Sequence, residues 1–228
     1  MEVQEGKTYL TVPHEGGRLT FQHPPFAGTY GIVAEQIDSQ ELGRPTSSQI
    51  SSLVQDTFQN PNGNYESQII DILREHGLWE FTGNLYLPKG KGDFQNGVIL
   101  EDNPQVRDRK LVMDTSKLIG KLEANDSSVR FVPFGYKTGE QTPKELGENP
   151  YIIARYGEEG AQKIAEVVAS KFRFNPVLWA LASVNQETAS MSALDRDWGF
   201  GCGLIVGGDG WVGVGGGRSF GVLDSKSQ

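Results

Sequence analysis

The sequence predicts an α+β protein with two regions, residues 1–104 and residues 105–228. Three observations predict this class. Helical periodicity recurs in three consecutive segments near the start, two β-rich segments follow them, and the last forty residues mix glycine with branched and aromatic residues. Hydrophobic residues make up 37% of the 228 residues, which is enough to bury a core, so we expect an ordinary soluble globular protein.

The first region is expected to begin with three helices, because apolar residues return every three or four positions in each segment. Gly43 ends the first helix, which starts near Tyr30. Thr46 or Ser47 is the expected N-cap of the second helix, and Gly77 follows the last periodic residue of the third. These start and stop signals divide the helical part of the region into three short elements.

A hairpin is expected next, with arms at residues 78–87 and 97–101 and a glycine- and lysine-containing tip at residues 88–96. Three short helices followed by a hairpin is the element order of a winged helix-turn-helix, so residues 25–104 are predicted to be winged-helix-like in architecture. Residues 105–110 are charged and are expected to form a connector to the second region.

The second region is predicted to be mixed α+β and to end in a glycine-rich antiparallel meander. The helix at residues 158–172 has a continuous apolar face and acidic residues in its first turn. The nearly uninterrupted apolar run at residues 177–184 predicts a central strand covered on both faces. Candidate meander strands lie at residues 189–194, 203–206, 211–214 and 219–223.

The charge of the chain disfavours nucleic acid as a partner. The formal net charge is −8, and the acidic excess lies mainly in the first half, so the long-range field repels phosphate groups. No signal-peptide pattern and no run of 18 apolar residues occurs, which predicts a cytoplasmic protein with no membrane segment. The single cysteine, Cys202, and three scattered histidines do not provide the spaced ligand pairs of a structural zinc site.

The candidate catalytic and metal-binding residues are Asp195 and Asp197. In an extended segment residues i and i+2 point to the same face, which places the two carboxylates roughly 7 Å apart at the Cα level, close enough to share a divalent cation. The alternative is structural: Asp195 ends a strand, Asp197 shapes a turn, and Arg196 neutralises them. Apart from a possible divalent cation, no cofactor is predicted.

Two other motif matches are rejected on their context. The glycine pattern at residues 208–213 matches a dinucleotide-binding loop, but more glycines follow it where the helix of such a loop must begin. Gly217, Ser219 and Gly221 match a nucleophile elbow, but no histidine follows them. The first rejection depends on the last forty residues forming short strands.

The function stays unknown at this level, and three hypotheses remain. We favour a protein-interaction or ligand-binding role, because the outward residues of the third helix are net acidic. The alternatives are a metal-assisted hydrolase or transferase that uses Asp195 and Asp197, and a winged-helix DNA-binding regulator. The oligomeric state is not predicted, although an open edge of the glycine-rich strands would allow another copy to pair.

Overall fold

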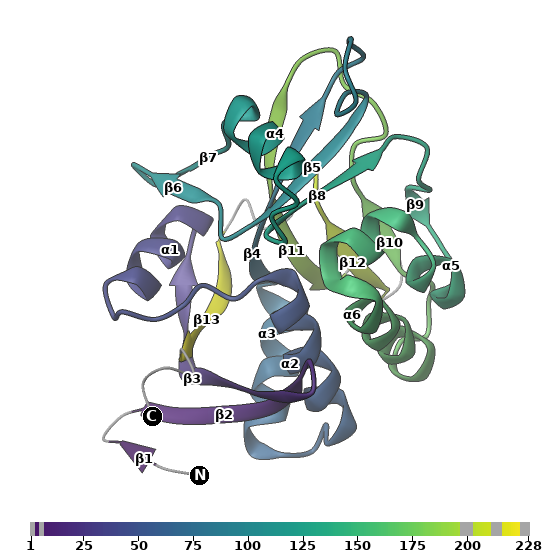
Figure 1. The fold of residues 1–228 in the computed structure, drawn as a ribbon. Coiled ribbons are helices and arrows are strands. Elements are labelled where there is room, and N and C mark those ends of the chain that lie inside the picture. The colour runs from purple at the N-terminus through teal and green to yellow at the C-terminus, as the bar shows by residue number, and fades with distance from the viewer. Residues whose placement is uncertain (1–2, 5–6, 197–202, 211–215, 224–228) are drawn as a thin grey trace.

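The structure is a computed structural model that describes residues 3–4, 7–196, 203–210 and 216–223. In this part of the chain, one mixed sheet of 11 strands forms the centre of the molecule (Figure 1). Its strands, in chain order, are β1 Val3–Gln4, β2 Lys7–His14, β3 Gly17–Gly28, β4 Leu78–Leu87, β5 Gly97–Asp102, β8 Val129–Pro133, β9 Gly139–Glu140, β10 Val177–Trp179, β11 Thr188–Arg196, β12 Leu204–Gly207 and β13 Gly217–Leu223.

The order of the strands across the sheet is β1-β2-β3-β13-β4-β11-β12-β10-β9, and β5 branches from β4 to pair with β8. A separate two-stranded ribbon joins β6 Gln105–Arg107 to β7 Lys110–Val112. The helices are α1 Tyr30–Asp38, α2 Ser47–Gln59, α3 Asn64–Glu75, α4 Thr115–Glu123, α5 Pro143–Gly147 and α6 Pro150–Lys171. No helix among the described residues has the length and apolar character needed to cross a membrane.

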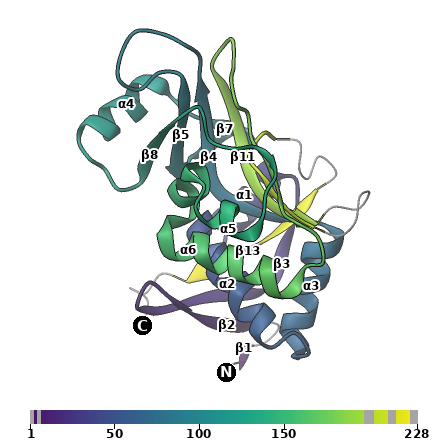
Figure 2. The ribbon, with the colours of Figure 1, turned by 90° about the vertical axis from the view of Figure 1, so that its right-hand side faces the viewer.

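Helices cover both faces of β4, and this explains why all ten of its residues are buried. Leu78 and Tyr86 belong to the main core, which includes residues of α2, α3 and α6. Trp79 and Phe81 point to the other face and pack with residues of α1. Figure 2 shows α6 and α2 on one side of this strand, with α4 near its far end. Because successive side chains of a strand point to opposite faces, β4 contributes to two hydrophobic layers, one on each face of the sheet.

Local signals set the helix starts where the sequence predicts them. The Thr46 side chain accepts a hydrogen bond from the backbone of Gln49, whose own side chain accepts from the backbone of Thr46, so a capping box opens α2. Thr142 and Glu145 form the same arrangement at α5. Helix α6 contains a break at Gly157, where φ is 74°, so the predicted helix from residue 158 is the second part of a longer element.

The winged-helix-like prediction for the N-terminal region is wrong. The predicted hairpin exists as β4 and β5, but β4 is a central strand of the large sheet and not an exposed wing. Strands β2 and β3 precede the three helices and join β4 through β13, which comes from the other end of the chain. The three helices therefore pack on a sheet built from distant segments. The division of the chain at residue 104 stays a prediction.

The predicted C-terminal meander is wrong beyond its first two strands. Strands β11 and β12 are antiparallel neighbours, but β12 pairs on its other edge with β10, in parallel, and β13 lies between β3 and β4. The predicted strand at residues 211–214 lies outside the described residues. The apolar run at residues 177–184 forms a strand only at Val177–Trp179, next to the edge strand β9, and Trp179 is 40% exposed. Ala180, Leu181 and Val184 instead pack against the main core from a loop.

Candidate functional site

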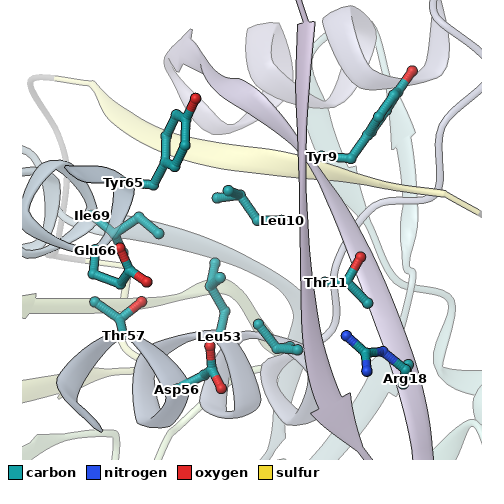
Figure 3. Close-up of a pocket in the computed structure, with 11 residues that line it drawn as sticks. Tyr9, Leu10, Thr11, Arg18, Leu53, Asp56, Thr57, Tyr65, Glu66 and Ile69 are labelled. Carbon is teal, nitrogen blue, oxygen red and sulfur yellow. The ribbon is translucent and has the colours of Figure 1, made fainter. Parts of the chain in front are cut away.

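The first wall of the candidate site is the β2–β3 hairpin. A two-residue turn joins the strands at the pair His14 and Gly17, and both turn residues have positive φ, 44° at Glu15 and 74° at Gly16. Alternation along β2 then sends Leu10 toward the helices, while Tyr9 and Thr11 lie on the opposite side of the strand (Figure 3).

The second wall is formed by α2 and α3. Both helices are amphipathic, and their buried residues Leu53 and Ile69 form part of the floor. The polar residues beside that apolar stripe, Asp56 on α2 and Glu66 on α3, are half-buried at the rim (Figure 3). Helical spacing of three and four residues thus places apolar and acidic side chains next to one another.

Between the two walls lies a cavity of about 370 Å³, which we call the β2 groove. This volume falls at the low end of the range of small-molecule pockets, roughly 300–1,000 Å³. The residues that line it are Tyr9, Leu10, Thr11, Val12, Arg18, Leu53, Asp56, Thr57, Tyr65, Glu66 and Ile69.

Charge is distributed unequally in the β2 groove. Burial raises the pKa of the Asp56 carboxyl, the nearby Glu66 carboxylate raises it further, and the exposed Arg18 across the groove lowers it in part. Figure 3 shows Asp56 and Glu66 on the helical wall and Arg18 on the hairpin wall. The helical wall therefore presents two carboxylates that repel each other, and a cation placed between them would relieve that repulsion.

Tyr65 at the other end of the β2 groove is held by its neighbours. Its ring packs edge to face against His23 with ring centroids 5.2 Å apart, and the His23 ring stacks on Phe220. The Tyr65 hydroxyl lies 3.4 Å from the hydroxyl of Thr8. Burial lowers the pKa of His23, and a hydrogen bond with Gln68 opposes that effect in part. The aromatic end of the groove is thus apolar, while the opposite end is charged.

The structure describes only one of the two predicted aspartates, Asp195. Asp195 lies near the end of β11, opposite Ile205 of β12, in the extended conformation that the sequence predicts. Asp197 lies outside the described residues. No cluster of three or more potential metal ligands occurs among the residues that the structure describes. The hypothesis that Asp195 and Asp197 share a catalytic cation therefore stays a prediction.

A second polar cluster joins the hairpin tip to the helices. The Nδ1 atom of His14 lies 3.0 Å from the hydroxyl of Ser52, and the Lys163 ammonium donates to that hydroxyl at 3.1 Å while it also pairs with Glu159 at 2.6 Å. Histidine beside serine can activate a nucleophile. Ser52, however, is only 3% exposed within α2, so a substrate has no access, and the cluster instead ties β2 to α2 and α6.

Comparison with known proteins gives one informative match. No protein-family description matches the sequence, and no curated protein is similar to it. One solved structure has a TM-score of 0.58 with 16% sequence identity, over 87% of this chain and 97% of that chain. Its description is "Accommodation of massive sequence variation in Nanoarchaeota by the C-type lectin fold". The fold resembles the C-type lectin fold. At this identity the likeness shows the fold alone, and it overturns the winged-helix interpretation.

Sequence reasoning missed the residues of the β2 groove, although a partial signal was present. Glu66 is recognisable as an outward acidic residue of the third helix, and Asp56 directly precedes the helical residues Thr57 and Phe58. Nothing in the sequence places Leu10 and Arg18 opposite them. The hairpin that carries those two residues is far along the chain from the helices, so only tertiary structure brings the two walls together.

Proposed function

We propose that this protein binds a protein partner and that the β2 groove receives a basic side chain of that partner. The observation that carries the proposal is the pair of half-buried carboxylates, Asp56 and Glu66, above an apolar floor. A lysine or arginine side chain has the matching form, since its aliphatic stem packs on apolar surface while its cationic head remains near polar groups.

The apolar floor supports a side chain with a long stem. Leu53, Val12 and Ile69 are each no more than 3% exposed and form a surface that a stem of methylene groups can cover. Tyr65 adds an aromatic wall, which also attracts cations through its ring face. The carboxylates then lie at the rim, where the charged head would be.

Electrostatics supports a cation over an anion in the β2 groove. The raised pKa of Asp56 has burial as its first cause and Glu66 as its second, and a bound cation would oppose both. The formal charge of −8 also attracts basic partners over a longer range. Arg18 offers one local cation on the opposite wall, and a carboxylate or carbonyl of the partner's backbone would complement it.

The test is a titration of the full chain against a fluorescein-labelled peptide that carries one lysine between two leucines, followed by fluorescence anisotropy. We expect a measurable Kd that rises roughly tenfold, or about 1.4 kcal/mol, in the double variant Asp56→Asn, Glu66→Gln. Asp71→Asn is the matched control. Asp71 is an exposed acid on α3, the helix that carries Glu66, but Asp71 does not line the groove.

Three outcomes would contradict the proposal. They are no binding of the lysine peptide at millimolar concentration, equal binding of a peptide in which norleucine replaces lysine, and equal loss of affinity in the Asp71→Asn control. A rise in ionic strength should weaken the complex, because the proposed contact is between opposite charges at a partly exposed rim.

A further inference from the structure

A second cavity lies on the other flank of α3 and has the opposite charge. It measures about 170 Å³ and is formed where the ends of α2 and α3 meet the end of α6. The residues that line it are Phe58, Ile70, Leu73, Arg74, Lys171, Phe172 and Arg173. We call it the α3–α6 pocket. Every charged side chain that lines it is a cation.

The pocket has an apolar floor and a basic rim. Phe58 and Phe172 pack with their ring centroids 5.7 Å apart, and Leu73 is only 3% exposed. Arg74, Lys171 and Arg173 surround that floor and are exposed. The Arg74 guanidinium lies 3.6 Å from Asp71 in an exposed i,i+3 pair, which screens that charge weakly. Three cations at one small opening contrast with the net charge of −8 for the whole chain.

We infer that the α3–α6 pocket is a binding site for an acidic segment of a protein partner, and that one apolar side chain of the segment fills the cavity. Carboxylates beside that side chain would pair with Arg74, Lys171 and Arg173. The inference is independent of the β2 groove, because no residue lines both cavities.

The small volume of the pocket favours a single partner side chain as its occupant over a free small molecule. Small-molecule sites measure roughly 300–1,000 Å³, and this pocket is about 170 Å³. Protein interfaces, in contrast, concentrate their binding energy in a few side chains that fill well-packed pockets, with contacts around them that exclude water. A floor of two phenylalanine rings and a leucine fits such an anchor.

The positive charge of the rim indicates that the partner residues beside the anchor side chain are acidic. Arginine pairs with carboxylates through two parallel hydrogen bonds, and two of the three rim cations are arginines. Lys171 lies in the last turn of α6, where a cation is also favoured by the helix dipole, so part of its role is local. Arg74 and Arg173 are therefore the residues on which the test concentrates.

The experiment titrates the full chain with fluorescein-labelled pentapeptides that have phenylalanine or leucine between pairs of acidic residues. We expect saturable binding that weakens with salt, and at least tenfold weaker binding when alanine replaces the central residue. The double variant Arg74→Glu, Arg173→Glu should lose at least tenfold in affinity. Lys144→Glu is the matched control, because Lys144 is an 82% exposed cation that does not line the pocket.

A second variant tests the cavity separately from its charge. Ile70→Trp keeps all three cations and adds bulk to the pocket, so we expect it to abolish the preference for phenylalanine over alanine. Circular dichroism and the melting temperature establish that each variant is folded. The exposed arginine substitutions provide the test if Ile70→Trp does not fold.

Several results would overturn the inference. One is no binding of either pentapeptide at 1 mM, and another is equal affinity for the alanine peptide. Sodium octanoate that binds while both peptides fail would assign the pocket to a free fatty acid instead. Loss of binding in the Lys144→Glu control to the same degree would show only general attraction between opposite charges.

Discussion

Arg155 is the residue whose replacement we expect to cost the most stability. Its side chain and that of Glu80 are both 0% exposed, and the two form an ion pair between α6 and β4. The guanidinium also donates to the carbonyl oxygens of Gly207 at 2.8 Å and Ala193 at 3.2 Å. Burial lowers the pKa of Arg155, but Glu80, Tyr156 and Tyr151 together more than offset this effect, so the pKa lies above its ordinary value. One side chain thus connects α6 with β4, β11 and β12.

The variant Arg155→Met keeps a long apolar side chain but removes the cation. Glu80 then retains two donors, the hydroxyl of Ser47 at 2.9 Å and that of Tyr156 at 2.9 Å. A buried carboxylate without a cationic partner is costly even when two hydroxyls donate to it, so we expect Glu80 to take up a proton in the folded variant. Protonating a glutamate of ordinary pKa, about 4.3, costs about 3.7 kcal/mol at pH 7. Breaking buried ion pairs typically costs about 3–5 kcal/mol, so we expect a loss of about 4 kcal/mol.

The pH dependence of that loss separates charge from packing. In the variant the folded state binds a proton that the unfolded state releases above pH of about 4.3, so its stability falls as the pH rises, by about 1.4 kcal/mol per pH unit. The deficit relative to the natural protein should therefore shrink to about 1 kcal/mol at pH 5.

Urea denaturation at pH 5, 6 and 7 measures both quantities. The double variant Glu80→Gln, Arg155→Met is the control, because it removes the buried acid and should show little of the pH dependence. A loss below about 1 kcal/mol at pH 7 would refute the argument, since breaking a buried pair costs several times more. A loss that does not change between pH 5 and pH 7 would refute the protonation step.

Three further changes test other features. Asp56→Asn should raise the free energy of unfolding at pH 7, because the pKa of Asp56 is raised in the fold and its ionised form therefore costs stability. Urea denaturation should show that this gain disappears below the ordinary aspartate pKa, about 3.9. Gly31→Ala should lower the melting temperature, because its Cβ would lie 2.1 Å from the backbone oxygen of Arg109, whereas Gly120→Ala, with open space around it inside α4, should not. Thr46→Ala should cost about 1 kcal/mol in urea denaturation through loss of the α2 capping box, and a cost near zero would contradict that role.

The local features of this chain follow from its sequence because they depend on residues close together. The cap at Thr46, the end of α3 before Gly77 and the strand that contains Asp195 all occur where short-range signals place them. Hydrogen bonds of caps and the spacing of apolar residues act over three or four positions, so no distant partner is needed.

The sheet order and the candidate sites could not be predicted in the same way. The burial of every residue of β4 results from α1 and α4 on one face and α2, α3 and α6 on the other, and from β13, which arrives from the far end of the chain. The β2 groove likewise needs Leu10 and Arg18 opposite Asp56 and Glu66. A predicted hairpin alone does not show whether it is a peripheral wing or the centre of a sheet.

The sequence by itself determined the positions of α1, α2, α3, β4, β5, β11 and β12, the cap of α2 and the acidic balance of the chain, but it did not predict the β2–β3 hairpin. Only the tertiary structure decided how the strands are ordered, which faces they bury and where acidic and basic cavities form beside α3. The physical reason is that periodicity and capping are short-range effects, while strand pairing between distant segments is selected by the total apolar surface that the folded chain removes from water.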